Sequence, residues 1–278
     1  MKQIALGIIL ITTNLYSQNM EKVFNQAVAA EINKIEKIET SILTEQDMTH
    51  LPDIVKKYLK YVGAVGKEKV LTLRAECSGG IRNDPRAPFM KIKAVQYNFY
   101  NDNPARLFYI VAKKIGLSAK VAHIYRNETA SMKGKLLGIF TIVDAKGEEA
   151  NKAETVTVFN DICLLAPALL ISKNIEWSVI DSLTVKAKYT NRKISIEAKL
   201  FFDNNGRLIN FTSKDRYETK DGKVFYNYPW QTPVIEYKII NELYLPSKIK
   251  TIFIHPDIEF CYGEFEVDKI EYNCLELK

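Results

Sequence analysis

Glycine, proline and cysteine are all scarce in this chain of 278 residues, which contains 12 Gly, 9 Pro and 4 Cys. Such a composition excludes a collagen-like chain and a low-complexity, disordered one. Four cysteines in a chain of this length are too few for a small disulfide scaffold. Hydrophobic residues make up 47% of the chain and charged residues 26%, which is ordinary globular composition. Length and composition together predict one large domain.

Motifs for cofactors and metals are also missing. The dinucleotide-binding and P-loop fingerprints, the H-E-x-x-H zinc motif and the G-x-S-x-G nucleophile turn are absent. No cysteine pair has C-x-x-C spacing, and the three histidines lie far apart in the sequence. We therefore expect neither a metal site nor a cofactor.

The cysteines are expected to be free thiols. Cys261 and Cys274 flank one expected strand, so roughly 40 Å of extended chain separates them, which is too far for a disulfide. Any bridge would have to include Cys77 or Cys163. Both lie in apolar patterns, which are typical of buried free thiols.

The basic residues form no tract, although they outnumber the acidic ones. The chain has 39 Lys and Arg against 33 Asp and Glu, a formal net charge of +6. A nucleic-acid-binding protein concentrates its basic residues, whereas these are scattered, so we expect no nucleic-acid partner. The pattern is typical of a solvated surface. The alternative is a peripheral contact with anionic headgroups of a membrane surface.

Residues 1–18 have the pattern of an export signal. Lys2 precedes an apolar stretch from Ile4 to Thr13, and a short polar segment follows. This stretch of ten residues fits the core of a signal peptide, whereas a membrane-spanning helix needs about 20. The predicted location is therefore periplasmic or secreted. A buried N-terminal helix is the alternative interpretation.

Hydrophobic periodicity predicts helices at the start and in the middle of the chain, and strands elsewhere. Helical spacing runs from Met20 to Leu43, from Pro52 to Val62 and from Glu148 to Ile171, where Pro167 interrupts it. After Gly66 the period changes to 2, with about five strands before the central helix and about six after it. Helices gathered on one face of a long antiparallel sheet predict an α+β fold.

The chain shows no composition shift or linker after its start. We therefore expect a signal peptide over residues 1–18, N-terminal helices over 19–66 and a single domain over 67–278, against which those helices pack. Several strands have bulky apolar residues on both faces, so both faces must be covered or one lines a hydrophobic groove. The candidate groove residues, taken from this alternation and from an aromatic loop, are Met90, Ile92, Ala94, Val95, Tyr97, Phe99, Phe108, Ile110, Leu137, Ile139 and Trp230.

No residue has a strong catalytic signature. His123 lies in an expected strand, and sequence alone gives it neither a nucleophile nor an orienting acid. Asp144 and Asp181 both follow apolar strands, where a carboxylate commonly caps a turn. We therefore do not expect the protein to be an enzyme.

The chain resembles a bacterial family of unknown function over about residues 44–273, because several short motifs follow one another in the order that is typical of this family. The motifs are Leu51-Pro52, Val55, Tyr58-Leu59, Gly63, Gly66, Gly80-Ile81-Arg82, Ala94-Val95-Gln96-Tyr97, Asn103-Pro104, Phe108, Met132-Lys133-Gly134, Leu137-Gly138, Val143-Asp144-Ala145-Lys146-Gly147, Pro167-Ala168-Leu169-Leu170, Trp177, Ile180-Asp181, Arg216, Pro229-Trp230, Glu236-Tyr237 and Leu245-Pro246. Phe89 and Leu165-Ala166 depart from the family pattern, where aromatic residues are usual.

That family in turn looks like a relative of the LolA/RseB-type half-barrels. The resemblance implies an exported domain in which a curved antiparallel sheet of about eleven strands, a half-barrel, carries helices on its concave face. It also implies binding of lipid or lipoprotein acyl chains, and it supplies no catalytic residues.

Three hypotheses for the function follow. The first is an exported binding protein for a hydrophobic ligand, such as a lipid or a lipoprotein acyl chain. The second is a protein–protein interaction or sensor module, which predicts no cavity larger than a few waters. The third is a hydrolase that uses His123 with a carboxylate and requires a polar pocket around that side chain.

Overall fold

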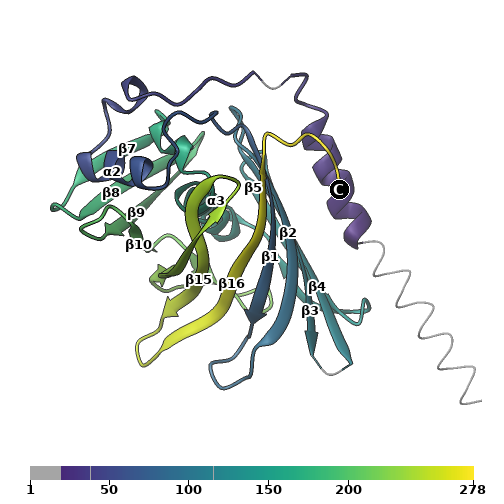
Figure 1. Ribbon diagram of the computed structural model, residues 1–278. Coiled ribbons are helices and arrows are strands. Elements are labelled where there is room, and N and C mark those ends of the chain that lie inside the picture. The colour runs from purple at the N-terminus through teal and green to yellow at the C-terminus, as the bar shows by residue number, and fades with distance from the viewer. Residues whose placement is uncertain (1–19, 38, 115) are drawn as a thin grey trace, which may run out of the picture.

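The computed structural model describes residues 20–37, 39–114 and 116–278 (Figure 1). The predicted export signal lies outside these residues. None of the described helices has the length and apolarity needed to cross a lipid bilayer.

A first helix covers residues 20–32. The other elements, in chain order, are η1 (Gln46–Met48), α2 (Asp53–Tyr61), β1 (Thr72–Ile81), β2 (Met90–Phe99), β3 (Ala105–Lys114), β4 (Leu117–Arg126), β5 (Thr129–Leu136), β6 (Phe140–Ala145), α3 (Glu148–Leu165), η2 (Pro167–Ile171), β7 (Ile175–Val179), β8 (Thr184–Asn191), β9 (Ile194–Phe202), β10 (Leu208–Ser213), β11 (Tyr217–Glu218), β12 (Tyr226–Asn227), β13 (Trp230–Gln231), β14 (Val234–Ile240), β15 (Leu243–Ile254) and β16 (Glu259–Tyr272). The predicted interruption at Pro167 is confirmed, because η2 starts there.

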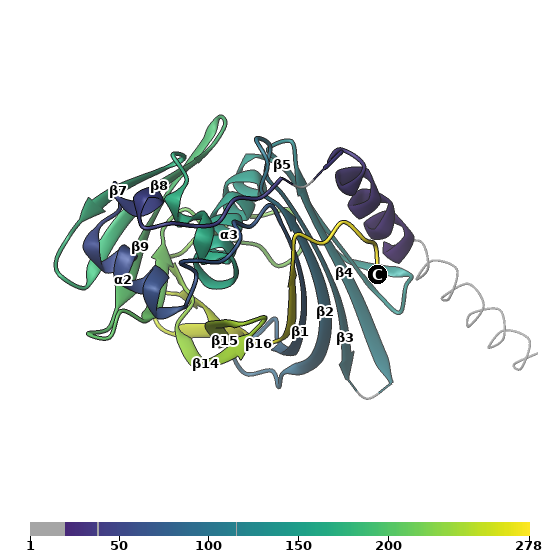
Figure 2. The same ribbon diagram turned by 45° about the horizontal axis from the view of Figure 1, so that its top comes forward.

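All the described strands except β11 and β12, which pair with each other, form one antiparallel, strongly curled sheet, so the predicted α+β half-barrel is confirmed (Figures 1 and 2). Within the described residues this sheet has 14 strands, more than the eleven expected, in the order β6-β5-β4-β3-β2-β1-β16-β15-β13-β10-β9-β8-β7, with β14 beside β15. Six of these strands precede α3 and eight follow it, against about five and about six expected. One of the additional strands, β13, has only two residues, which is too short to show a periodicity.

The two halves of the sheet join where the first strand pairs with the last. β1 lies between β2 and β16, and its register with β16 shifts between Glu76 and Cys77. Such bulges bend a strand and increase its twist, which helps the sheet to curl. Gly79 follows the bulge with φ +140°, and a Cβ there would stand 2.0 Å from the Glu264 carbonyl oxygen. This close approach requires glycine.

Helices α2 and α3 fill the concave face, where the larger core lies. Figure 2 shows α3 between the two halves of the curled sheet. Tyr58 of α2 is fully buried and donates a hydrogen bond to the Cys163 carbonyl oxygen of α3 at 2.7 Å. All four cysteines are free, and Cys77 and Cys163 are buried, as expected.

The first helix packs on the opposite, convex face, against β2, β3 and β4 (Figure 2). Phe24 is buried there, with ring centroids 6.3 Å from Tyr97 and 5.4 Å from Tyr109. The helix ends at residue 32, so its predicted extension to Leu43 is wrong. Leu43 belongs to the core of the concave side. The chain therefore has to leave the helix in order to cross from one face of the sheet to the other.

Candidate functional site

A cavity of about 120 Å³ lies between α3 and the concave face of the sheet. Part of its lining is apolar and comes from Phe108, Phe265 and Val267 of the sheet and from Leu164 and Leu165 of α3. The rest is polar, and the charged or amide side chains are Gln96, Arg106, His123, Glu154, Asn160, Asp161 and Arg216. The cavity is thus amphipathic, with charged groups placed inside the core.

Two acidic residues of α3 supply the negative charge. Glu154 and Asp161 are seven residues apart, which is close to two helical turns, so both side chains lie on the face that meets the sheet. Both side chains are buried. Buried carboxylates are costly unless they are paired, and here a single cation serves both of them.

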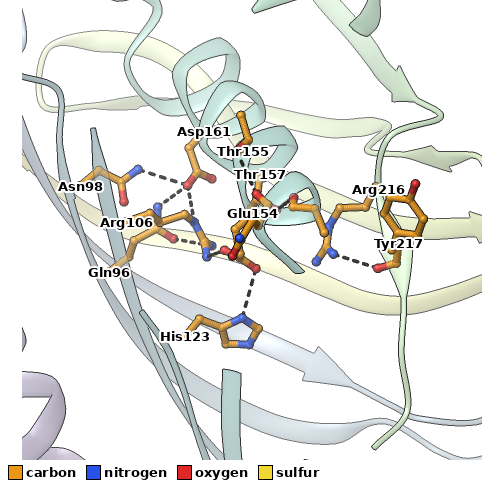
Figure 3. Close-up of polar contacts among 12 residues, drawn as sticks. Gln96, Asn98, Arg106, His123, Glu154, Thr155, Thr157, Asp161, Arg216 and Tyr217 are labelled. Carbon is orange, nitrogen blue, oxygen red and sulfur yellow. Dashed lines mark hydrogen bonds and ion pairs between the residues drawn. The ribbon is translucent and has the colours of Figure 1, made fainter. Parts of the chain in front are cut away.

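Arg106 of β3 is that cation. Its Nε lies 2.6 Å from Asp161 Oδ2, and its Nη1 lies 3.1 Å from Glu154 Oε2. The guanidinium also lies 4.8 Å from the centre of the Phe108 ring and donates to Gln96 Oε1 at 3.2 Å. Figure 3 shows the contacts of Arg106 with Gln96, Glu154 and Asp161.

Two side chains of β2 donate further hydrogen bonds to Asp161. Its Oδ2 accepts hydrogen bonds from Gln96 Nε2 at 2.7 Å and from Asn98 Nδ2 at 3.1 Å (Figure 3). Burial raises the pKa of the Asp161 carboxyl, and the charge of Arg106 and the hydrogen bonds oppose that rise. The network fixes α3 to β2 and β3, and it holds the polar lining in one arrangement.

Glu154 orients His123. The Nδ1 atom of His123 lies 3.3 Å from Glu154 Oε1. Burial alone would raise the pKa of Glu154, but the hydrogen bond from His123 and the charge of Arg106 hold it well below its usual range. Glu154 is therefore ionised and can only accept, so Nδ1 of His123 carries the proton and donates it. The arrangement resembles the base-and-orienting-acid pair of hydrolytic enzymes.

Arg216 brings a second cation to the cavity. Its guanidinium lies 5.6 Å from the centre of the Trp230 ring, and its Nη1 donates to the Tyr217 carbonyl oxygen at 3.1 Å. Its Nε is buried and has no hydrogen-bond partner in the described part of the chain. A buried donor without an acceptor costs free energy. This atom is therefore suited to an acceptor oxygen supplied by a ligand.

A family model matches residues 41–265 and is described as a family of unknown function, DUF6544. The chain belongs to DUF6544. This confirms the resemblance to a family of unknown function that the sequence predicted. No curated protein matches this DUF6544 chain.

Solved structures similar to this DUF6544 protein include three with low sequence identity. A DUF1329 family protein from Desulfovibrio piger is 11% identical, with a TM-score of 0.43, over 84% of this chain and 94% of that one. A LolA superfamily protein from Nitrosomonas europaea is 8% identical, with a TM-score of 0.41, over 80% and 93%. A domain from Vibrio parahaemolyticus described as an outer membrane lipoprotein-sorting protein is 8% identical, with a TM-score of 0.40, over 73% and 85%. The likeness concerns the fold alone.

The predicted groove residues of this DUF6544 chain fall into four places. Those on the concave face, where the cavity lies, are Met90, Ile92, Ala94, Phe108 and Ile110. Those on the convex face, beside the first helix, are Val95, Tyr97 and Phe99. Leu137 and Ile139 are exposed in the turn between β5 and β6. Trp230 is buried and lines the cavity. Phe108 and Trp230 are therefore the two that line the cavity itself.

The polar lining was not predicted from the sequence, apart from His123, which entered only the hydrolase hypothesis. The signals that could have found it are a charged residue inside an apolar strand and two acids on one face of an apolar helix. Arg106 stands in such a strand, and Glu154 and Asp161 stand on such a helix. A buried charge needs an ion-pair partner. The partners of Arg106, which are Glu154 and Asp161, lie 48 and 55 residues away in the sequence, so no local pattern links them.

Cys77 lines the cavity but is no nucleophile. Burial raises the pKa of its thiol to about 12, with a further contribution from the charge of Asp161. Since the thiolate is the reactive form, the Cys77 side chain is chemically inert at neutral pH.

Proposed function

We propose that the protein is an exported binding protein for a hydrophobic ligand, a lipid or the acyl chain of a lipoprotein, held between α3 and the concave face. The observation that carries the proposal is the amphipathic cavity inside a curled sheet. Each methylene group transferred from water to an apolar lining contributes about 0.8 kcal/mol. A chain ligand therefore binds without any special chemistry at its tail.

The head of the ligand would meet Arg216. Arg106 is already engaged by Glu154 and Asp161, whereas Nε of Arg216 has no acceptor among the described residues. A carboxylate, ester or phosphate oxygen would satisfy that donor. We therefore expect an amphiphile with an oxygen-rich head rather than a pure hydrocarbon.

The volume limits how much of a chain fits with α3 in this position. An apolar cavity of roughly 150 Å³ takes a benzene molecule, and this cavity measures about 120 Å³. A longer chain has to follow the concave face outward or displace α3. Along that face, Ile110 pairs with Val121, and Leu136 pairs with Phe140, so apolar residues continue to the end of the sheet.

Native mass spectrometry of protein purified from its own source, followed by organic extraction, tests the proposal. We expect a co-purified amphiphile of defined mass, and we expect added fatty acid to compete with it. In the double variant Ile249→Asp/Phe265→Asp, which places charges on two paired strands facing the cavity, binding should fall at least about tenfold. Ile239→Asp, on the most exposed apolar residue of β14, is the matched control.

An apo mass that persists after addition of lipids would contradict the proposal. Circular dichroism of the double variant separates loss of binding from loss of folding. If the folded double variant binds fatty acid as well as the Ile239→Asp control does, the ligand lies elsewhere.

A hydrolase is the second candidate, because His123 and Glu154 lie 3.3 Å apart in a polar part of the cavity. Neither Cys77 nor Thr157, whose hydroxyl donates to the Ala153 carbonyl oxygen, is an activated nucleophile there. The reaction would therefore use water. Turnover of an acyl ester that disappears in His123→Ala, with ligand binding retained, would establish this candidate; no turnover in the unsubstituted protein would remove it.

A further inference from the structure

Five large apolar side chains are exposed together at one end of the sheet, in and beside the turns of two neighbouring hairpins. The turn between β5 and β6 touches the start of β4, because the Leu137 backbone N–H donates to the Ser118 carbonyl oxygen at 2.8 Å. We call this group the apolar tip, and its residues are Leu117, Leu137, Ile139, Phe140 and Ile142. Their exposed fractions run from 36% for Leu137 to 61% for Phe140. Exposed apolar clusters of this kind are typical of contact surfaces.

Lysines lie beside the apolar tip. Lys113 and Lys114 immediately precede the β3–β4 turn, and Lys91 pairs with Lys113 across the sheet. All three are exposed, and no carboxylate of the described residues forms a salt bridge with them. An open depression of about 1060 Å³ runs between these lysines on the convex side of the same end. Its one acidic residue, Glu266, is already paired with Lys238 at 2.7 Å.

We propose that this end of the sheet docks on an anionic lipid bilayer. The apolar tip would enter the boundary between headgroups and acyl chains, while Lys91, Lys113 and Lys114 contact the headgroup phosphates. A surface that combines apolar and basic residues matches the two layers that a bilayer presents. A single lysine near an anionic surface strengthens binding about fivefold.

The charges favour a bilayer over a second copy of the chain. In a twofold dimer through the apolar tip, the lysines of one copy would face the same lysines of the other. That arrangement would bring unpaired like charges together around a desolvated contact. An anionic bilayer neutralises the same lysines.

Docking in this way would also place this end of the concave face against the membrane. Leu117 pairs with Lys114 and Phe140 pairs with Leu136, which puts both apolar residues on the concave side of the sheet. The inference goes beyond ligand binding and does not depend on it. A protein with an empty cavity would dock as well as a loaded one.

Vesicle flotation tests the inference with the full chain, in whichever processed form it is purified. The probes are vesicles of phosphatidylcholine alone and of phosphatidylcholine with an equal part of phosphatidylglycerol. We expect strong binding to the anionic vesicles and weak binding to the neutral ones. Lys113→Gln/Lys114→Gln should weaken binding to anionic vesicles about 25-fold, and Phe140→Asp should weaken it at least about tenfold.

The matched controls change exposed lysines and an exposed apolar residue away from the apolar tip. Lys173→Gln/Lys193→Gln removes two exposed lysines near β7 and β9, and Ile239→Asp changes an apolar residue of β14 that is 78% exposed. Both should bind vesicles as the unsubstituted chain does. Comparing variants in one processed form keeps the contribution of residues 1–19 constant.

Two readouts make a negative result decisive. Phe140→Trp should give a blue-shifted, quencher-protected emission with anionic vesicles if the apolar tip enters the bilayer, and an unshifted emission would overturn the inference. Equal flotation of the tip variants and the controls would also overturn it. A concentration-dependent dimer that Phe140→Asp abolishes, without any vesicle binding, would instead assign the apolar tip to contacts between copies.

Discussion

Arg106 carries the charge balance of the concave side, because one guanidinium serves two carboxylates of the same helix. Breaking a buried pair of this kind leaves an uncompensated charge and costs about 3–5 kcal/mol. Glu154 depends on Arg106 and His123, and Arg216 adds a further favourable charge. The stability of the fold should therefore depend on the ion pairs that Arg106 makes with Glu154 and Asp161.

The stability of the protein should depend on pH through Glu154. Its pKa is lowered in the folded state, so its contribution is complete above the unfolded value of 4.5 and is lost as the pH falls below it. Glu154→Gln should destabilise the fold by about 3 kcal/mol at neutral pH. That difference should shrink as the pH falls below 4.5, because Glu154 of the unfolded chain is protonated there while Glu154 of the folded protein stays ionised down to its lowered pKa.

Urea unfolding of both proteins between neutral and acidic pH checks this expectation. Asp53→Asn is the control, since the Asp53 side chain is fully exposed. A free-energy difference between Glu154→Gln and the unsubstituted protein that stays constant over the whole pH range would show that Glu154 is not held ionised by its partners.

Individual site residues were only partly predictable, for a geometric reason. Alternation assigns the residues of a strand to two faces, but it does not say which face a helix will cover. β2 carries Ile92 and Ala94 on one face and Tyr97 and Phe99 on the other, and both faces are apolar because each meets a different helix. Arg106 was overlooked because its partners, 48 and 55 residues away, are brought to it only by the fold.

At the scale of elements, the helix of residues 20–32 packs in the smaller of the two cores. It rests on the convex face through a small separate core in which Phe24 is the largest buried side chain of the helix. The C-terminal residues run beside it, and the Lys278 backbone N–H donates to the Tyr97 hydroxyl at 3.1 Å. The pattern of Met20 to Leu43 predicted a longer helix because apolar residues for two different cores follow one another in the sequence.

Phe24→Ala should release this helix without unfolding the sheet. Truncating a buried phenylalanine costs about 3–5 kcal/mol when the whole fold must absorb it. Here local release of residues 20–32 limits the loss, because the larger core contains none of them. Hydrogen exchange should therefore accelerate in residues 20–32 while β8 and β9 keep their protection.

Ile32→Ala, at the partly buried end of the same helix, is the matched control and should change exchange less. Loss of protection throughout the sheet in Phe24→Ala would show that the first helix and the sheet unfold as one unit.

At the scale of the whole molecule, the half-barrel depends on the joint between β1 and β16. A hairpin such as β8–β9, which turns at Arg192 with φ +53°, can be predicted because turn residues and alternation specify neighbouring strands. The joint between β1 and β16 could not be predicted, because almost the entire sheet lies between these two strands in the sequence. A long-range pairing of this kind leaves no local pattern, and only the matching of the two curled halves selects it.

Gly79→Ala should therefore weaken the fold as a whole. A Cβ at this position would meet the Glu264 carbonyl oxygen at 2.0 Å, so β16 would have to move away from β1. Gly116→Ala is the matched control, because Gly116 also has a positive φ, +76°, yet a Cβ there meets nothing within 4 Å. Backbone strain alone costs about 1 kcal/mol; the clash should add at least about 2 kcal/mol to it in Gly79→Ala. Denaturant unfolding of the two variants isolates the clash, and equal midpoints would mean that the two halves of the sheet do not depend on this joint.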